Sequence, residues 1–232
     1  MTLGKLLLAM TALATFGVAA AEKMPESWDG LVQVKPKRLD AAYVLPGADF
    51  RPYTKVMLDP TEVAFRKDWL RNMNDSRAGV SRDISPKDAD RILAAARSDF
   101  GDVFAKAFAK AGYKVVAVPG PDVLRISPMV LDLYVNAPDT MSAGRSTSYT
   151  MESGEAKLVI EVRDSVSAAL LGRAVDRRET RRAGSLEWSN SVTNRADFRQ
   201  LAQQWAAICT KGLKELKDQS PVPADLKPKQ KL

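Results

Sequence analysis

The amino-acid sequence predicts an α+β domain in two layers: a mainly antiparallel sheet of about four to six strands, with two long helices packed on one face. Two observations support this prediction. Residues 85–111 and 194–216 repeat apolar side chains every three to four positions, as helices with one buried face do. Residues 113–178, between them, hold short apolar runs separated by turn residues. Strands joined by short turns pair antiparallel, so the two helices would cover the same face of the sheet.

Residues 1–21 have the composition of an export signal. Lys5 is their only charged residue, and it precedes a largely apolar run over residues 6–18. Residues 19–21 are all alanine, which suits a signal peptidase, so we predict a signal peptide that is cleaved after Ala21. The apolar run is shorter than the ~20 residues of a membrane-spanning helix, and no cysteine follows it to accept a lipid. The expected product is a periplasmic or secreted protein that is neither a lipoprotein nor an integral membrane protein.

Residues 22–42 are predicted to form an extended segment on the surface, because their prolines and glycine disfavour regular structure. This segment carries a basic cluster of Lys35, Lys37 and Arg38. Two short strands are expected next, at 43–45 and 55–58, each stopped by a turn that contains proline. Residues 61–84 lack a clear period, and we expect a loop with one helical turn.

The first long helix has clear start and stop signals. Ser85 suits the N-cap, Pro86 suits the first helical position, and Asp88 places a carboxylate near the positive end of the helix. Gly112 suits a left-handed C-terminal stop. The apolar stripe comprises Ala89, Ile92, Leu93, Ala96, Phe100, Val103, Phe104, Phe108 and Ala111.

Four strands are predicted between the two helices. The first two cover 113–118 and 123–135, and Pro128 in the second favours an edge position or a bulge. The last two, at 156–163 and 168–178, alternate apolar and polar residues, which is typical of an antiparallel hairpin with one wet face.

The second long helix is predicted to begin at Asn194 as its cap. Its stripe comprises Phe198, Leu201, Trp205, Ile208, Cys209, Leu213 and Leu216. Cys209 within this stripe is predicted to be a buried, inert thiol. Residues 43–217 would form a single α+β domain, and the lysine-rich residues 218–232 a flexible basic tail.

Composition excludes several chemistries. The chain has 232 residues, of which 45% are hydrophobic and 27% charged, as in soluble globular proteins. It contains no histidine, which excludes Ser-His-Asp triads, Cys-His dyads and the commonest zinc and haem ligand sets. Its single cysteine excludes an intrachain disulfide. We predict no cofactor and no metal, and no residue pattern indicates a catalytic group.

The densest basic stretch contains Arg173, Arg177, Arg178, Arg181 and Arg182. Strand alternation places Arg173 and Arg177 on one face and Arg178 on the other. The sequence favours a solvated strand laced with ion pairs, and contact with a partner is the alternative. The candidate contact residues are Arg173, Arg177, Arg181 and Trp188. No aromatic residue interleaves these arginines, so the expected partner is another envelope protein or an anionic envelope surface and not nucleic acid.

Several short motifs resemble a known family. They are SWDGL at 27–31, YVLPGADF at 43–50, YTKVMLDP at 53–60, AGY at 111–113 and PGPDVLR at 119–125. Together they resemble a family of exported bacterial proteins catalogued as domain of unknown function 3313. That family has no established activity, so the resemblance implies no catalytic residues. Its members often look like envelope lipoproteins, whereas this chain has no lipid-accepting cysteine after its signal.

The sequence therefore favours an exported, non-catalytic binding or accessory module of the cell envelope. Two alternatives stay open. A hydrolase of an envelope polymer that uses Asp and Glu would need two carboxyls in reach of each other, one with a raised pKa. A carrier of a small apolar ligand would need an internal cavity between the sheet and the helices.

Overall fold

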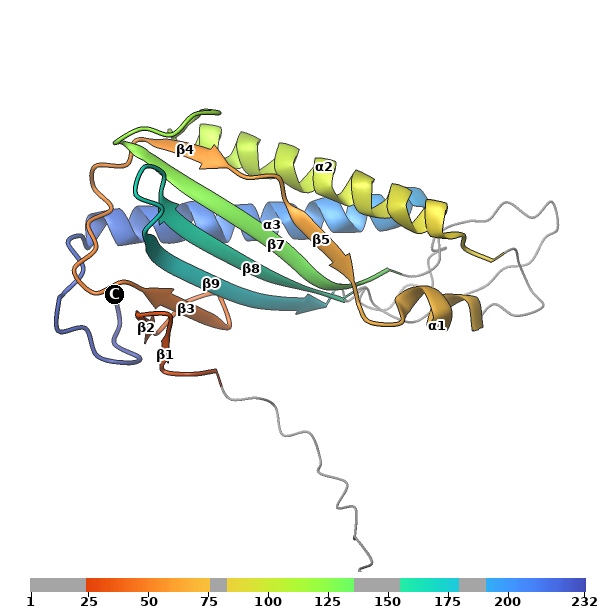
Figure 1. Cartoon of the computed structure of the whole chain (residues 1–232), viewed down its shortest axis with the longest axis horizontal. Helices are drawn as coiled ribbons and strands as arrows, with labels where there is room; N and C mark the ends of the chain where they lie inside the picture. The colour runs from red at the N-terminus through yellow and green to blue at the C-terminus, as the bar shows by residue number, and fades with distance from the viewer. Residues whose placement is uncertain (1–23, 76–82, 136–154, 180–190) are drawn as a thin grey trace, which may run out of the picture.

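The computed structural model describes residues 24–75, 83–135, 155–179 and 191–232. Within these residues the chain forms three helices and one nine-stranded mixed sheet (Figure 1). In sheet order the strands are β1 (Ser27–Trp28), β2 (Leu31–Val34), β3 (Ala41–Val44), β9 (Leu170–Glu179), β8 (Glu155–Asp164), β7 (Val123–Tyr134), β4 (Lys55–Leu58) and β6 (Lys114–Val115), and β5 (Glu62–Phe65) also pairs with β7. The helices are α1 (Trp69–Asp75), α2 (Pro86–Lys110) and α3 (Ser191–Asp218). The α+β class is confirmed, and the predicted sheet of four to six mainly antiparallel strands is corrected to a nine-stranded mixed sheet.

Each parallel pair in the sheet includes at least one of its short strands. β4 and β5 run one after the other along β7, both parallel to it, and β6 is parallel to β4. Each parallel pair needs a long crossover, which α1 and α2 provide. Strands of two to four residues carry too little pattern to reveal such distant pairing, which is why the sequence prediction missed it. For Pro128 we predict an edge position or a bulge. The edge is wrong, because β7 is a central strand, and Pro128 lies opposite the break between β4 and β5.

The two long helices form where the sequence predicts them. The Ser85 hydroxyl accepts the N–H of Asp88 at 3.2 Å, and the Asp88 carboxylate accepts the N–H of Ser85 at 3.0 Å, which closes a capping box. Gly112 follows α2 with a φ of 93°. α3 begins at Ser191, earlier than the predicted cap at Asn194. None of the helices in the described part of the chain combines the length and hydropathy needed to cross a membrane.

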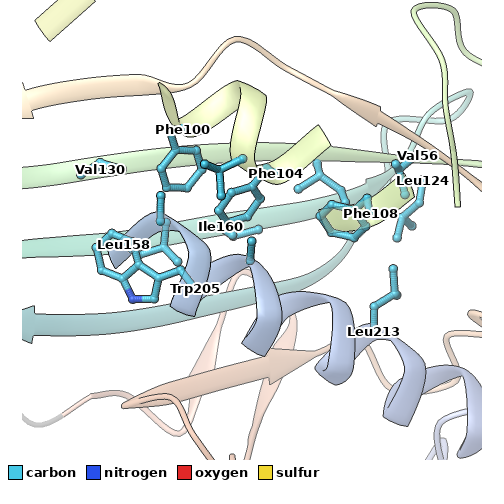
Figure 2. Close-up of a cluster of buried hydrophobic side chains, with 14 of the residues drawn as sticks. Val56, Phe100, Phe104, Phe108, Leu124, Val130, Leu158, Ile160, Trp205 and Leu213 are labelled. Carbon is cyan, nitrogen blue, oxygen red and sulfur yellow. The ribbon is translucent and has the colours of Figure 1, made fainter. Parts of the chain in front are cut away.

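The main core lies between the sheet and the two long helices. α2 and α3 pack against each other, and their apolar stripes meet the same cluster of strand residues (Figure 2). Its members include Phe100, Phe104 and Phe108 of α2, Trp205 and Leu213 of α3, and Leu124, Val130, Leu158 and Ile160 of the sheet. A second, smaller cluster contains Leu31, Ala41, Tyr43, Val159 and Val175.

The last residues of the chain return to the sheet. For residues 218–232 we predict a flexible tail. In the structure, hydrogen bonds join this segment to residues near the start of the chain. The N–H of Val222 donates to the carbonyl of Ala48 at 2.8 Å, and the N–H of Lys229 donates to the carbonyl of Gln33 at 2.7 Å. The side chains of Val222 and Leu226 are buried. This path brings the end of the chain beside β2.

Candidate ligand-binding cavity

A cavity of about 160 Å³ lies between the sheet and the C-terminal half of α3. Its sheet side is formed by β3, β7, β8 and β9, and its helix side by residues 208–216 of α3. Most of the lining is apolar. Small residues line it from both sides: Ala42, Gly172 and Ala174 from the sheet, and Cys209 and Gly212 from the helix. Because Ala42 pairs with Ala174 in the β3–β9 ladder, small side chains lie side by side on the floor of the cavity.

The two glycines that line the cavity differ in how closely other atoms approach them. A Cβ on Gly172 would lie 3.2 Å from the carbonyl oxygen of Tyr43, so the close approach of β3 favours glycine there. A Cβ on Gly212 would have no heavy atom within 4 Å. Glycine inside a helix costs about 1 kcal/mol relative to alanine. No neighbour demands a glycine at 212, and this glycine borders the cavity.

Cys209 is half-buried and lines the cavity. Burial, followed by the negative charge of Asp176, raises the pKa of its thiol to about 12. The thiol is therefore protonated at neutral pH and acts as a small apolar group in the lining. A protonated thiol agrees with the predicted inert one, but Cys209 is half-buried and not fully buried as predicted.

Basic residues stand at the mouth of the cavity. Lys35, Lys37 and Arg38 lie in the connection between β2 and β3, and Glu215 lies on the last turns of α3. The Lys37 ammonium and the Glu215 carboxylate form an ion pair at 3.3 Å. Leu232, the last residue of the sequence, also lines the cavity. The basic cluster seen in the sequence is thus placed beside an apolar cavity, which no local pattern could reveal.

The arginines proposed from the sequence as contact residues have different surroundings. Arg173 is 7% exposed and donates to Glu161 at 2.6 Å and to Asp29 at 2.8 Å. Its guanidinium also lies 4.0 Å from the centre of the Trp28 ring. Arg177 is exposed and ion-paired with Glu155. The carboxylates around Arg173 fit the ion-paired strand that the sequence favours, although Arg173 is buried and not solvated.

The other two proposed contact residues, Arg181 and Trp188, lie outside the described residues. The strand register places Arg173 and Arg177 on one face of β9, opposite Glu161 and Lys157 of β8. Contact of this face with a partner stays a prediction.

The buried carboxylates of the described residues are held by nitrogen donors. Asp99 of α2 is 1% exposed and accepts hydrogen bonds from Arg195 and Arg199 of α3, each at 2.6 Å. The hydrogen bond from Arg195 is the main cause that lowers the pKa of Asp99, and it outweighs the effect of burial. Asp176 of β9 accepts the indole N–H of Trp205 at 2.8 Å.

Among the described residues, every carboxyl with a resolved pKa shift is shifted downward: Asp49, Asp99, Asp122, Glu161 and Asp164. A carboxyl that acts as a general acid at neutral pH needs a raised pKa. The described residues also contain no group of three or more Cys, Asp and Glu side chains placed to hold a metal ion.

Comparison with known proteins gives a family match. The model of the DUF3313 family, described as proteins of unknown function, matches residues 20–208. No curated protein matches the chain.

Some solved structures match with low identity. The PelC dodecamer from Paraburkholderia phytofirmans is 10% identical, with a TM-score of 0.35 over 73% of this chain and 96% of that chain. Protein XCC0632 from Xanthomonas campestris is 12% identical, with a TM-score of 0.40 over 80% and 93% of the two chains. A putative neuraminyllactose-binding hemagglutinin homolog from Helicobacter pylori is 11% identical, with a TM-score of 0.36 over 75% and 92%. Likeness at this level carries no inference about function.

Proposed function

This chain belongs to the DUF3313 family of proteins of unknown function, and we propose that it is an exported, non-catalytic binding module of the cell envelope that holds a small apolar group in its cavity. The observation that carries the proposal is the apolar cavity of about 160 Å³ beside a densely packed core. An engineered protein cavity of about 150 Å³ with similar apolar walls binds benzene. A single aromatic ring or a short alkyl chain is therefore the expected size of the bound group.

The energetics of packing support a ligand. A fully enclosed void of this size would cost about 4 kcal/mol, at about 24 cal/mol per Å³. The cavity is open at its mouth, so its actual cost is smaller, but apolar walls gain little from water. An apolar ligand would recover contacts that the small side chains leave unmade.

Binding of benzene to the mature protein tests the proposal. We expect saturable changes in the amide NMR signals of Ala174, Cys209 and Gly212. Gly212→Leu should fill the cavity and abolish the changes, with Cys209→Met as a second filling variant. Gly101→Leu is the matched control, because a Cβ at Gly101 of α2 also has no neighbour within 4 Å but Gly101 does not line the cavity. Unchanged signals in the wild-type protein at saturating benzene would overturn the proposal.

Export is the second part of the proposal and rests on residues 1–21. The mass of the protein recovered from the periplasm of a Gram-negative host tests it. We expect an N-terminus at Glu22. A protein that keeps Met1 and stays in the cytoplasm would overturn this part alone.

A further inference from the structure

We propose that the cavity takes an amphiphile with an acidic head group, a carboxylate or a phosphate. Its short apolar tail occupies the cavity, and its head lies at the mouth beside Lys35 and Arg38. This inference rests on the proposed binding function and adds the chemistry of the head group. Three observations at the mouth carry it: unpaired cations, a fixed backbone that presents them, and an excess of positive charge.

Two of the cations at the mouth are free to meet a ligand. Lys35 and Arg38 are exposed and line the cavity. Among the described residues, neither side chain has a carboxylate within ion-pair distance. Lys37, between them, is already paired with Glu215 at 3.3 Å. An anion at the mouth would therefore meet two cations that no described acid neutralises.

The backbone around these cations is anchored on both sides. The N–H of Lys35 donates to the carbonyl of Gln230 at 2.9 Å. Arg178 donates from Nη2 to the carbonyl of Arg38 at 3.0 Å, and the N–H of Asp40 donates to the buried Asp176 carboxylate at 3.2 Å. The connection between β2 and β3 is thus fixed to the C-terminal segment and to β9. Preorganised cations lose less conformational entropy when they bind an anion.

The balance of charge favours an acidic head over a neutral or basic one. The charged side chains that line the cavity are those of Lys35, Lys37, Arg38 and Arg173 against the single carboxylate of Glu215, so positive charge is in excess. A guanidinium matches the geometry of carboxylates and phosphates with paired hydrogen bonds. The apolar lining disfavours a buried charge, so the head group would stay at the mouth and the tail would enter.

A series of six-carbon ligands tests the head group. Hexanoate, hexyl phosphate, 1-hexanol and hexylammonium share one tail, so differences in their affinities for the mature protein report on the head. We expect one or both acids to bind about threefold to tenfold more tightly than hexanol, as exposed ion pairs allow. Hexylammonium should bind most weakly. Added salt should weaken the binding of the acids and leave hexanol unchanged.

Variants separate a direct role of the cations from a structural one. Lys35→Ala combined with Arg38→Ala should remove the preference for the acids and leave hexanol binding unchanged. Lys214→Ala is the matched control, because Lys214 is an exposed lysine of α3 that pairs with Asp218 and does not line the cavity. Equal affinity for hexanol and both acids in the wild-type protein would overturn this inference and leave the proposed binding function intact. Equal weakening of acids and hexanol by the double variant would also overturn it. Failure of every ligand to bind would overturn both proposals.

Discussion

The two halves of α3 meet the same sheet in different ways. In the first half, Trp205 is buried in one cluster with Phe100 of α2 and Leu158 of β8 (Figure 2), and Leu201 belongs to the same cluster. In the second half, residues 208–216 border the cavity. The lining contributed by the second half includes a half-buried cysteine and a glycine, Cys209 and Gly212, beside the larger Ile208, Leu213 and Leu216. We call residues 198–206 the packed half and residues 208–216 the hollow half.

This difference shows that residues on one apolar stripe can have different roles, some filling the core and others bordering a cavity. The packed half fills its space and also makes polar contacts, from Arg199 to Asp99 of α2 and from Trp205 to Asp176 of β9. The hollow half leaves space that its own side chains could have filled, since Gly212 has room for a Cβ. Stability should therefore depend mainly on the packed half, and ligand binding on the hollow half.

The largest expected effect is in the packed half. Trp205 is fully buried, and its indole N–H donates to Asp176. Trp205→Ala should lower the free energy of unfolding by about 3–5 kcal/mol, because it leaves a cavity and removes a donor from a buried carboxylate. Urea unfolding measures this change. Cys209→Ala, the matched substitution in the hollow half, should cost about 1 kcal/mol or less because the site is already open. Equal costs for the two variants would contradict the comparison.

An intermediate effect is expected where α2 holds the start of the packed half. Asp99→Ala removes the acceptor of Arg195 and Arg199 and should cost about 1–3 kcal/mol. The cost is not larger because the two arginine side chains are 57% and 38% exposed and can turn to water. Asp122→Ala, which removes the exposed pair with Lys55, should lower the free energy of unfolding much less than Asp99→Ala does, because solvent screens the pair.

The contact of Asp99 with Arg195 and Arg199 should make the free energy of unfolding depend on pH. The pKa of Asp99 is lower in the folded chain than the ordinary value of 3.8. Its contribution is therefore fully present above that value and is lost as the pH falls through the folded pKa. Unfolding free energies of wild type and Asp99→Ala, measured from pH 6 downward, should converge below about pH 4. A constant difference down to the acid transition would show that the contact is not ionic.

The sequence predicts the helices well because their signals are local. The stripe and the capping box of Ser85 and Asp88 lie within a few turns of each other, and α2 forms over the predicted range. The sequence predicts strands at the positions of β4 and β6, but it predicts neither β5 nor the parallel pairing of the three, because that pairing depends on a crossover through α2. Local pattern is enough for an element that stabilises itself, and not for one that is stabilised by distant partners.

The sequence does not place the cavity, for the same reason. Its floor needs Ala42 of β3 beside Ala174 of β9, and only strand pairing brings these residues together. One local signal was present in the sequence. The stripe of α3 changes from Trp205 to Cys209, and Gly212 adjoins it. A run of small residues at consecutive turns of a helix with a buried face indicates either a close helix contact or a space.

The smallest expected effect is the sharpest test of the hollow half. Gly212→Ala should raise the free energy of unfolding by about 1 kcal/mol, because alanine favours the helix and its Cβ meets no neighbour. Gly101→Ala in α2 should stabilise the fold by a similar amount for the same reason. Only the substitution at 212 places a methyl group in the cavity lining, so only it should weaken benzene binding. If both variants gain stability and both keep full binding, Gly212 does not hold the cavity open, and the division of α3 into a packed and a hollow half loses its functional meaning.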